Sequence, residues 1–221
     1  MVGADVSDLA QFQHPRFARM YERISAESER RGTAEHRDRL LSGLAGRVIE
    51  VGAGNGMNFG HYPDTVTEVV AVEPDDHLRC LAEQAAARAE VPVRVMAGHA
   101  TALPVAAASF DAAVASLVLC SVSDVSAALA ELRRALKPDG ELRFFEHVRS
   151  DKPWFVLLQD TITPLWSRVG GGCHPNRDTA AAVSAAGFDI DELDRFSFAP
   201  LRFFPSHAHV LGRARPRPTT Q

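Results

Sequence analysis

An apolar run followed by three alternating glycines is the part of this sequence best suited to holding a ligand. The run is Val48–Val51, and the glycines are Gly52, Gly54 and Gly56. Glycine lets the backbone approach a ligand closely at a strand-to-helix turn. Glu73 ends a second apolar run, 21 residues after Gly52, where a carboxylate can accept hydrogen bonds from ribose hydroxyls. Together the two runs predict an adenosine site in a parallel α/β sheet.

The spacing of the glycines separates one adenosine cofactor from another. Dinucleotide folds favour G-x-G-x-x-G, but here the third glycine comes one residue early and Met57 takes its place. Glu50, two residues before the first glycine, suits a cationic ligand better than a diphosphate. S-adenosylmethionine (SAM) carries a sulfonium and an α-amino group and no phosphate. We therefore expect SAM rather than a nicotinamide cofactor, although a glycine-rich turn also occurs without any ligand.

The composition is that of an ordinary globular domain with a small-molecule partner. The 221 residues are 46% hydrophobic and 24% charged, enough for one sizeable core. The net charge of −4 gives no general attraction to nucleic acid, and no Asn/Asp-Pro-Pro-Tyr base-flipping motif occurs. The composition says nothing about the oligomeric state.

The cysteines and the lack of a long apolar run indicate the compartment. Cys80, Cys120 and Cys173 are an odd number of cysteines without a C-x-x-C pair, which fits reduced thiols in a cytoplasm. No apolar run approaches the roughly 20 residues of a membrane span. We therefore expect a cytoplasmic protein without a transmembrane segment.

The candidate residues need a sheet whose strands alternate with helices. We expect strands at 47–51, 68–73, 92–97, 110–119, 141–148, 188–196 and 207–213, and helices at 12–31, 36–44, 124–137, 154–166 and 177–186, with a further helix opened by Pro74-Asp75-Asp76. Such alternation predicts a parallel sheet with helices on both faces. We expect one domain over 1–221, in which 1–46 covers the cofactor, 47–150 binds it and 151–215 forms the acceptor side.

These elements, with the motifs Ser109-Phe110-Asp111 and Leu136-Lys137-Pro138-Asp139-Gly140, resemble the class I SAM-dependent methyltransferases from about residue 40 onward. The resemblance implies a Rossmann-like, seven-stranded, mostly parallel sheet whose last strand is antiparallel. It also implies a set of cofactor-binding positions, which are Glu50, Gly52, Ala53, Gly54, Gly56, Asn58, Glu73, Pro74, His99, Ala100, Leu117 and Cys120. His99 departs from the family pattern, because many relatives carry an aspartate there that bonds to the adenine amine.

Four shorter pieces narrow the resemblance. They are Gly56–Phe59 before Tyr62-Pro63, Leu117–Val122, Glu146–Val148 and Gly172–Arg177. Together they resemble the animal membrane-associated thiol methyltransferases within the methyltransferase type 11 group. That resemblance implies a thiol acceptor. Those animal proteins have an apolar N-terminal anchor that this sequence does not show, so membrane attachment is not carried over.

Glu146 and His147 are the candidate catalytic residues. They end the fifth strand, on the rim where α/β sheets bind ligands. Either could act as a base or hold the substrate, or both could be a structural pair bonded to nearby backbone. We prefer His147 as the base because the ordinary pKa of histidine lies near neutrality. We expect no nucleophile in Cys120, because methyl transfer from SAM needs no covalent relay.

Three further features have two interpretations each. Cys173-His174 with the pair His207 and His209 could bind a metal, but without a second paired ligand set we expect none. The glycine-rich loop 170–174 could move to close over the acceptor. An apolar stripe near the start of the chain could be a lid over the cofactor or ordinary packing, and its members are Phe12, Phe17, Met20 and Tyr21.

The sequence therefore predicts a SAM-dependent methyltransferase of a small-molecule acceptor, first of all an apolar thiol. An amine or hydroxyl acceptor is the alternative within the same reaction. A non-catalytic SAM-binding protein and a nicotinamide oxidoreductase are the rival classes. A thiol needs no protein base, since a few per cent of it is already ionised near neutrality.

Overall fold

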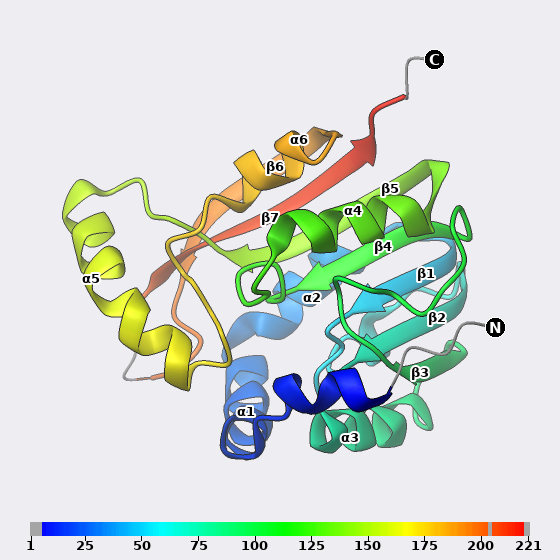
Figure 1. Ribbon diagram of the computed structural model, residues 1–221, viewed down its shortest axis with the longest axis horizontal. Helices are drawn as coiled ribbons and strands as arrows, with labels where there is room; N and C mark the ends of the chain where they lie inside the picture. Colours follow the sequence, from blue (N-terminus) through cyan, green and yellow to red (C-terminus); the bar gives the residue numbers. More distant parts are fainter. Residues whose placement is uncertain (1–5, 203–204, 219–221) are drawn as a thin grey trace.

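The computed structural model describes residues 6–202 and 205–218, with side chains from residue 9 onward. Within these residues seven strands form one sheet in the order β3-β2-β1-β4-β5-β7-β6 (Figure 1). The strands are β1 (Gly46–Val51), β2 (Val66–Glu73), β3 (Val93–Ala97), β4 (Phe110–Ser116), β5 (Leu136–His147), β6 (Phe188–Phe198) and β7 (His207–Pro216). Neighbouring pairs from β3 to β5 are parallel, whereas β7 is antiparallel to both β5 and β6. The predicted fold is confirmed.

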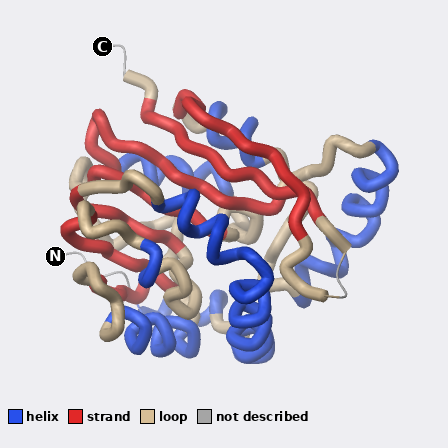
Figure 2. Tube along the Cα trace, turned by 180° about the vertical axis from the view of Figure 1, so that it is seen from behind, coloured by secondary structure: helices blue, strands red, loops and turns tan. Residues whose placement is uncertain are grey.

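Helices cover both faces of the sheet. They are α1 (Pro15–Ser28), α2 (Ala34–Leu41), α3 (Asp76–Ala86), α4 (Val125–Ala135), α5 (Pro153–Val169) and α6 (Thr179–Ala185), with short helical turns η1 (Val6–Phe12), η2 (Glu29–Thr33) and η3 (Phe59–His61). In Figure 1, α4 and α6 lie in front of the sheet, and Figure 2 shows α2 crossing its other face. The helices thus bury a sheet that is apolar on both sides, as parallel strands require.

Two hydrophobic cores lie on opposite faces of the same strands. Ile49 and Phe144 belong to one core, and their chain neighbours Val48 and Phe145 belong to the other. Because successive side chains of a strand point to opposite faces, each central strand contributes to both cores. This double burial fixes the carboxyl ends of β1, β4 and β5 relative to one another.

Several element boundaries differ from the prediction for local reasons. The predicted helix 12–31 is interrupted before Pro15, which occupies the first turn of α1. Proline is tolerated in this turn because the backbone N–H that it lacks would have no partner within the helix. β4 ends at Ser116 rather than at residue 119, because Leu117 takes a left-handed conformation with φ of 60°. β5 begins five residues earlier than predicted, at Leu136. The sequence predicts no regular element for residues 1–10, and of these residues 1–5 lie outside the described residues.

α5 projects beyond the edge of the sheet (Figure 1). The helix exposes large apolar side chains, which are Trp154, Leu157, Leu158, Ile162, Leu165 and Val169. No helix within residues 6–202 and 205–218 is long and apolar enough to cross a membrane.

Candidate active site

The three glycines after β1 all have left-handed backbones but serve different purposes. Their φ angles are 61° at Gly52, 58° at Gly54 and 79° at Gly56. A Cβ on Gly56 would lie 2.8 Å from side-chain atoms of Phe59 and Ala85, so this glycine allows close packing. A Cβ on Gly54 would lie 3.2 Å from the Tyr21 ring. Gly54 is therefore the glycine that faces the N-terminal helix α1.

Glu73 lies next to this turn, as the spacing predicted. Its Oε2 accepts a hydrogen bond of 2.8 Å from the Gly54 backbone N–H, and its Oε1 accepts one of 3.0 Å from Asp75. Burial raises the pKa of Glu73 to about 7. Each oxygen keeps a lone pair, so the buried carboxylate can still accept bonds from a ligand's hydroxyl groups.

Glu50 and Asn58 form a buried network beneath the turn. Glu50 accepts hydrogen bonds from Tyr62 Oη at 2.7 Å and Asn58 Nδ2 at 2.9 Å. Burial raises the pKa of Glu50 to about 7 despite these donors. The Arg37 guanidinium donates to Asn58 Oδ1 and forms an ion pair with Glu29 at 3.0 Å. The network places a buried cation near the carboxyl ends of β1 and β4.

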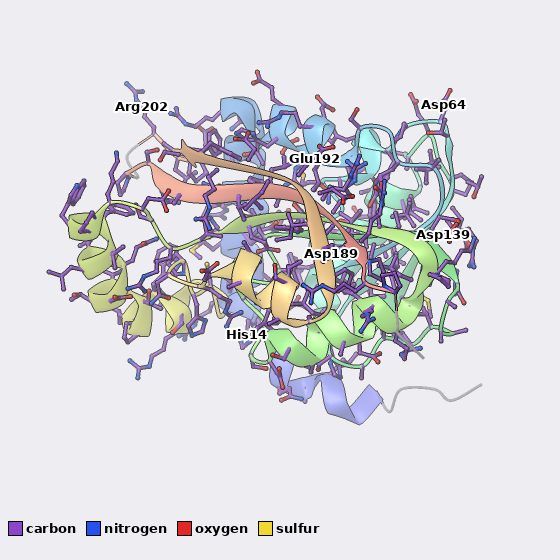
Figure 3. The ribbon with its side chains drawn as sticks, turned by 90° about the horizontal axis from the view of Figure 1, so that it is seen from above. His14, Asp64, Asp139, Asp189, Glu192 and Arg202 are labelled. Atoms are coloured by element: carbon purple, nitrogen blue, oxygen red, sulfur yellow. The ribbon has the colours of Figure 1, made fainter. Side chains whose placement is uncertain are left out.

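The N-terminal segment closes over the strand ends. Gln13 Nε2 donates to the Pro74 carbonyl at 2.9 Å, and the Asp76 backbone N–H donates to Gln13 Oε1 at 3.0 Å. His14, labelled in Figure 3 at the junction of η1 and α1, donates its backbone N–H to Asp75 at 3.1 Å. These contacts join the segment directly to the turn after β2, and its role as a lid stays a prediction.

The remaining predicted cofactor positions surround the same strand ends. The His99 ring stacks on Phe12 with centroids 4.9 Å apart, and its Nδ1 lies 2.8 Å from Thr101 Oγ1. Ala53 and Ala100 are buried in the two cores on either side of the sheet. Leu117 donates its backbone N–H to Phe145 at 2.7 Å. These residues follow the carboxyl ends of β1, β3 and β4.

The carboxylate of Glu146 binds the backbone of the loop after β4. Its carboxylate accepts hydrogen bonds of 2.8–3.0 Å from the N–H groups of Val118, Leu119 and Cys120. The side chain is completely buried, and burial raises its pKa well above the usual range. Of the two interpretations, this geometry matches the structural group bonded to backbone rather than the base.

His147 meets two cysteines from distant parts of the chain. Its Nδ1 lies 3.5 Å from the sulfur of Cys120 and 3.5 Å from that of Cys173, and the two sulfurs are 3.8 Å apart. The hydrogen bond to Cys173 and burial raise the pKa of Cys120. Burial lowers the pKa of His147, but the contact with Cys120 and the nearby Glu146 together outweigh burial, so the pKa is raised overall. From the sequence, His174 and the pair His207 and His209 were the candidate partners of Cys173 instead.

An apolar cavity of about 310 Å³ opens beside this cluster. The residues that line it come from the end of β5, from α5, from the following loop and from the start of β7, and they are His147, Phe155, Leu158, Gln159, Ile162, Trp166, Cys173, Pro175, Pro205 and His207. None of these residues is an acid, a lysine or an arginine. The cavity therefore suits an apolar, uncharged ligand.

The glycine-rich loop after α5 is held by contacts on both sides. A Cβ on Gly171 would lie 2.5 Å from the Phe17 ring, and one on Gly172 would lie 2.7 Å from the Ser121 carbonyl oxygen. The His174 N–H donates to the Cys120 carbonyl at 2.7 Å. The glycines thus allow close contact with a side chain of α1 and with the backbone after β4, and movement of the loop stays a prediction.

Known proteins are similar to this chain in sequence and in fold. A family profile described as "Methyltransferase domain" matches residues 49–144. Human thiol S-methyltransferase TMT1B is 33% identical over 180 residues, which cover 79% of this chain and 73% of the human protein. The chain belongs to the SAM-dependent methyltransferases, in the family that includes these thiol S-methyltransferases.

Solved structures agree with the fold of this methyltransferase. A SAM-dependent methyltransferase from Thermotoga maritima, described as a possible histamine N-methyltransferase, superposes with a TM-score of 0.70 at 21% identity, over 91% of this chain and 97% of that one. YcgJ from Bacillus subtilis superposes with a TM-score of 0.67 at 19% identity, over 83% and 99% of the two chains.

The methyltransferase's own residues fit SAM. Glu73 offers a buried carboxylate with free lone pairs. The glycine turn after β1, here called the glycine cradle, would be narrowed by any side chain at Gly54. Asn55 Oδ1, in the same turn, is buried without a partner among the described residues. These features agree with the cofactor that the family uses.

Sequence reasoning missed two contributors to the donor side. Arg37 is one of two arginines in a polar helix, and no local pattern distinguishes it from a solvated residue. Tyr62 appeared only as part of the family resemblance, although its hydroxyl bonds directly to Glu50. Tyr21 was identified within the apolar stripe, but its proximity to Gly54 depends on how α1 crosses the sheet.

Proposed function

We propose that this methyltransferase methylates the sulfur of small apolar thiols. The observation that carries the proposal is the apolar cavity without an acid, lysine or arginine, whose wall includes His147 and Cys173. Thiols are the acceptors of the human relative TMT1B, as its name states. A thiol can lose its proton near neutrality, so a cavity without a carboxylate base is sufficient for it.

On the donor side, the chain's residues bind and orient the cofactor. When bound, SAM supplies an electrophilic methyl group on a sulfonium. We assign Glu73 to the ribose hydroxyls and the Gly52–Gly54 backbone to the methionine end. Arg37 would neutralise the cofactor carboxylate. Its guanidinium lies close to the strand ends, because it approaches Ser116 Oγ at the end of β4 at 3.5 Å.

The lid contributes by excluding water and fixing the line of transfer. Tyr21 packs at Gly54, and Phe17 of the same helix packs at Gly171 of the acceptor-side loop. One helix therefore contacts both halves of the site. Methyl transfer depends on holding donor and acceptor in line at near-contact distance, and α1 is placed to close both halves together.

Methylation of an amine or hydroxyl is the alternative acceptor chemistry. Such acceptors require a base, and His147 is the candidate in the cavity wall. The His207 imidazole is a weaker base there, because burial and the nearby His147 lower its pKa to about 4. The absence of nucleic-acid binding and the cytoplasmic location stay predictions.

The test is a direct comparison of acceptor classes. Purified protein is incubated with SAM and matched apolar thiols, amines and phenols, and S-adenosylhomocysteine and the methylated product are measured by mass spectrometry. We expect thioether formation with thiols to be the fastest reaction. Faster turnover of amines or phenols would contradict the proposed acceptor. A protein that binds SAM without methylating any of them would support a non-catalytic role.

A further inference from the structure

We propose that Cys120, His147 and Cys173 form a site for a thiophilic divalent metal ion, with Zn²⁺ as the first candidate. One coordination position of the metal is open to the acceptor cavity. The three donors come from the loop after β4, the end of β5 and the loop after α5. The use of the open position by an acceptor thiol rests on the proposed function, whereas metal binding itself does not.

The distances between the donor atoms match a tetrahedral zinc site. Zn–S bonds of about 2.3 Å and Zn–N bonds of about 2.0–2.1 Å place two sulfurs about 3.8 Å apart and sulfur and nitrogen about 3.5 Å apart. In this structure the Cys120 and Cys173 sulfurs are 3.8 Å apart, and each lies 3.5 Å from His147 Nδ1. All three edges of one face of the tetrahedron are therefore already at ligand spacing.

The backbone holds the two thiols in place. The Cys120 N–H donates to Glu146 Oε2 at 3.0 Å, and the Cys120 carbonyl accepts from His174 at 2.7 Å. The Cys173 N–H donates to Gly170 at 3.2 Å. Because these bonds do not involve the donor atoms, the cluster is preorganised and a metal would bind with little rearrangement.

The ligand set suits zinc chemically. Two thiolates and one neutral imidazole give no net charge with a divalent cation, which lowers the cost of burial. Cys120 is completely buried, and Cys173 is nearly so. Trp166 forms a side-chain hydrogen bond to Cys173, and such outer contacts orient metal ligands and tune their basicity.

The fourth position faces the cavity because two of the three ligands line it. His147 and Cys173 are cavity-wall residues, whereas Cys120 is not. Three protein ligands with one open position are the pattern of catalytic rather than structural zinc. The His207 ring also lines the cavity, with its centroid 5.6 Å from that of His147. We assign His207 to the wall and leave the fourth position to the acceptor.

An acceptor thiol at that position would be activated without a protein base. The thiol coordinates through sulfur as the thiolate, and its proton passes to solvent. The new sulfur–methyl bond forms as the methyl–sulfonium bond of SAM breaks, and that electron pair remains on S-adenosylhomocysteine. The product thioether is neutral and a weaker ligand than a thiolate, so it can leave.

Cobalt(II) titration under reducing conditions tests the metal site. Metal-stripped protein is titrated with Co²⁺, and we expect one ion per chain, with thiolate-to-cobalt charge transfer and the strong visible bands of tetrahedral cobalt. Added Zn²⁺ should displace the cobalt. Octahedral spectra, or no saturable binding, would overturn the site.

Variants identify the ligands. Cys173→Ser should weaken cobalt affinity by more than the roughly 10–100-fold that loss of an outer contact costs, while circular dichroism and SAM affinity stay near wild type. Cys120→Ala is the second ligand variant. Cys80→Ser is the matched control, because Cys80 is an exposed cysteine on α3 outside the cluster. Unchanged cobalt spectra in both ligand variants would refute the assignment.

The open position has its own readout. An apolar thiol added to the cobalt protein should strengthen the charge-transfer band, and His207→Ala should leave cobalt affinity unchanged. No response to thiol, or loss of cobalt in His207→Ala, would overturn the open position. Stoichiometric cobalt binding without thiol methylation would refute the proposed acceptor while leaving the metal site standing. Full methylation by metal-free protein would refute the metal's part in the reaction.

Discussion

The carboxylate of Glu73 accepts a 2.8 Å hydrogen bond from the backbone N–H of Gly54, joining the ends of β2 and β1. The contact aligns the acid with the glycine cradle before any ligand binds. A side chain that is already fixed loses little entropy on binding, so more of its interaction energy is available for affinity.

Glu73→Ala should weaken SAM binding by about tenfold or more. Charge-assisted hydrogen bonds contribute on the order of 1.5–3 kcal/mol each, and about 1.4 kcal/mol is tenfold in affinity. Calorimetry measures the effect. Glu68→Ala is the control, because Glu68 lies on the same strand but pairs with Arg47 at the surface. Equal affinities for the two variants would place the ribose elsewhere.

Arg37→Ala should separate the two ends of the cofactor. We expect weaker binding of SAM but little change for methylthioadenosine, which lacks the amino-acid end that Arg37 is proposed to neutralise. Glu73→Ala should weaken both ligands. An equal loss of both ligands in Arg37→Ala would mean that the arginine acts only through the buried network with Asn58 and Glu29.

Gly54→Val should abolish SAM binding while circular dichroism stays native. A branched side chain there meets the Tyr21 ring and fills the cradle. Gly43→Val isolates the cost of the backbone, because Gly43 has φ of 74° but no atom lies within 4 Å of the place a Cβ would take. Tight SAM binding by Gly54→Val would show that the cofactor does not use this turn.

The ligand-free protein should lose stability as pH rises through about 7. Burial raises the pKa values of Glu50 and Glu73 from 4.5 to about 7. Between these values the folded chain binds more protons than the unfolded chain, so the free energy of unfolding falls with rising pH. Buried His207 and His209, whose pKa values are lowered to about 4 and about 2, act in the opposite direction, mainly below their ordinary value of 6.5.

Comparing variants with wild type separates the contribution of Glu50 to the pH dependence of the free energy of unfolding from that of the histidines. Chemical unfolding of Glu50→Gln and wild type at about pH 6.5 and about pH 8 should show a smaller decrease in the variant. Glu68→Gln should keep the wild-type decrease. The same decrease in all three proteins would contradict the raised pKa of Glu50.

Phe155→Ala should change acceptor size preference without changing SAM affinity. Removing the ring enlarges the cavity, so KM should fall for bulky thiols and rise by roughly tenfold for small ones. Trp154→Ala is the matched control, since Trp154 is 66% exposed and does not line the cavity. An unchanged size profile would place the acceptor outside this cavity.

The sequence predicted the sheet well because its strands carry unambiguous signals. Continuous apolar runs mark buried parallel strands, and the glycine turn and Glu73 lie where their spacing placed them. The predicted strand boundaries were wrong where the backbone conformation of a single residue ended the strand, as Leu117 does after β4. The close packing of Gly171 and Gly172 could not be predicted, because a mobile loop and a closely packed loop can have the same glycine content.

The acceptor side was harder to predict because it depends on contacts between distant segments. Cys120 and Cys173 are 53 residues apart in sequence, and His147 meets them only after β5 and the loop after α5 have folded together. Sequence spacing detects metal ligands when they are paired on one segment, and here each segment supplies one donor. The alternatives for Glu146 could be separated only by finding its three backbone partners.

Glu146 and His147 are consecutive residues whose side chains leave β5 in different directions, one to the loop after β4 and the other to the cavity. Insertion or deletion of a single residue before them would exchange these directions. A change in length of this part of the strand would therefore disrupt both sets of contacts at once. Changes in acceptor range can instead accumulate at the cavity-lining residues of α5, such as Phe155 and Ile162, without altering the length of β5.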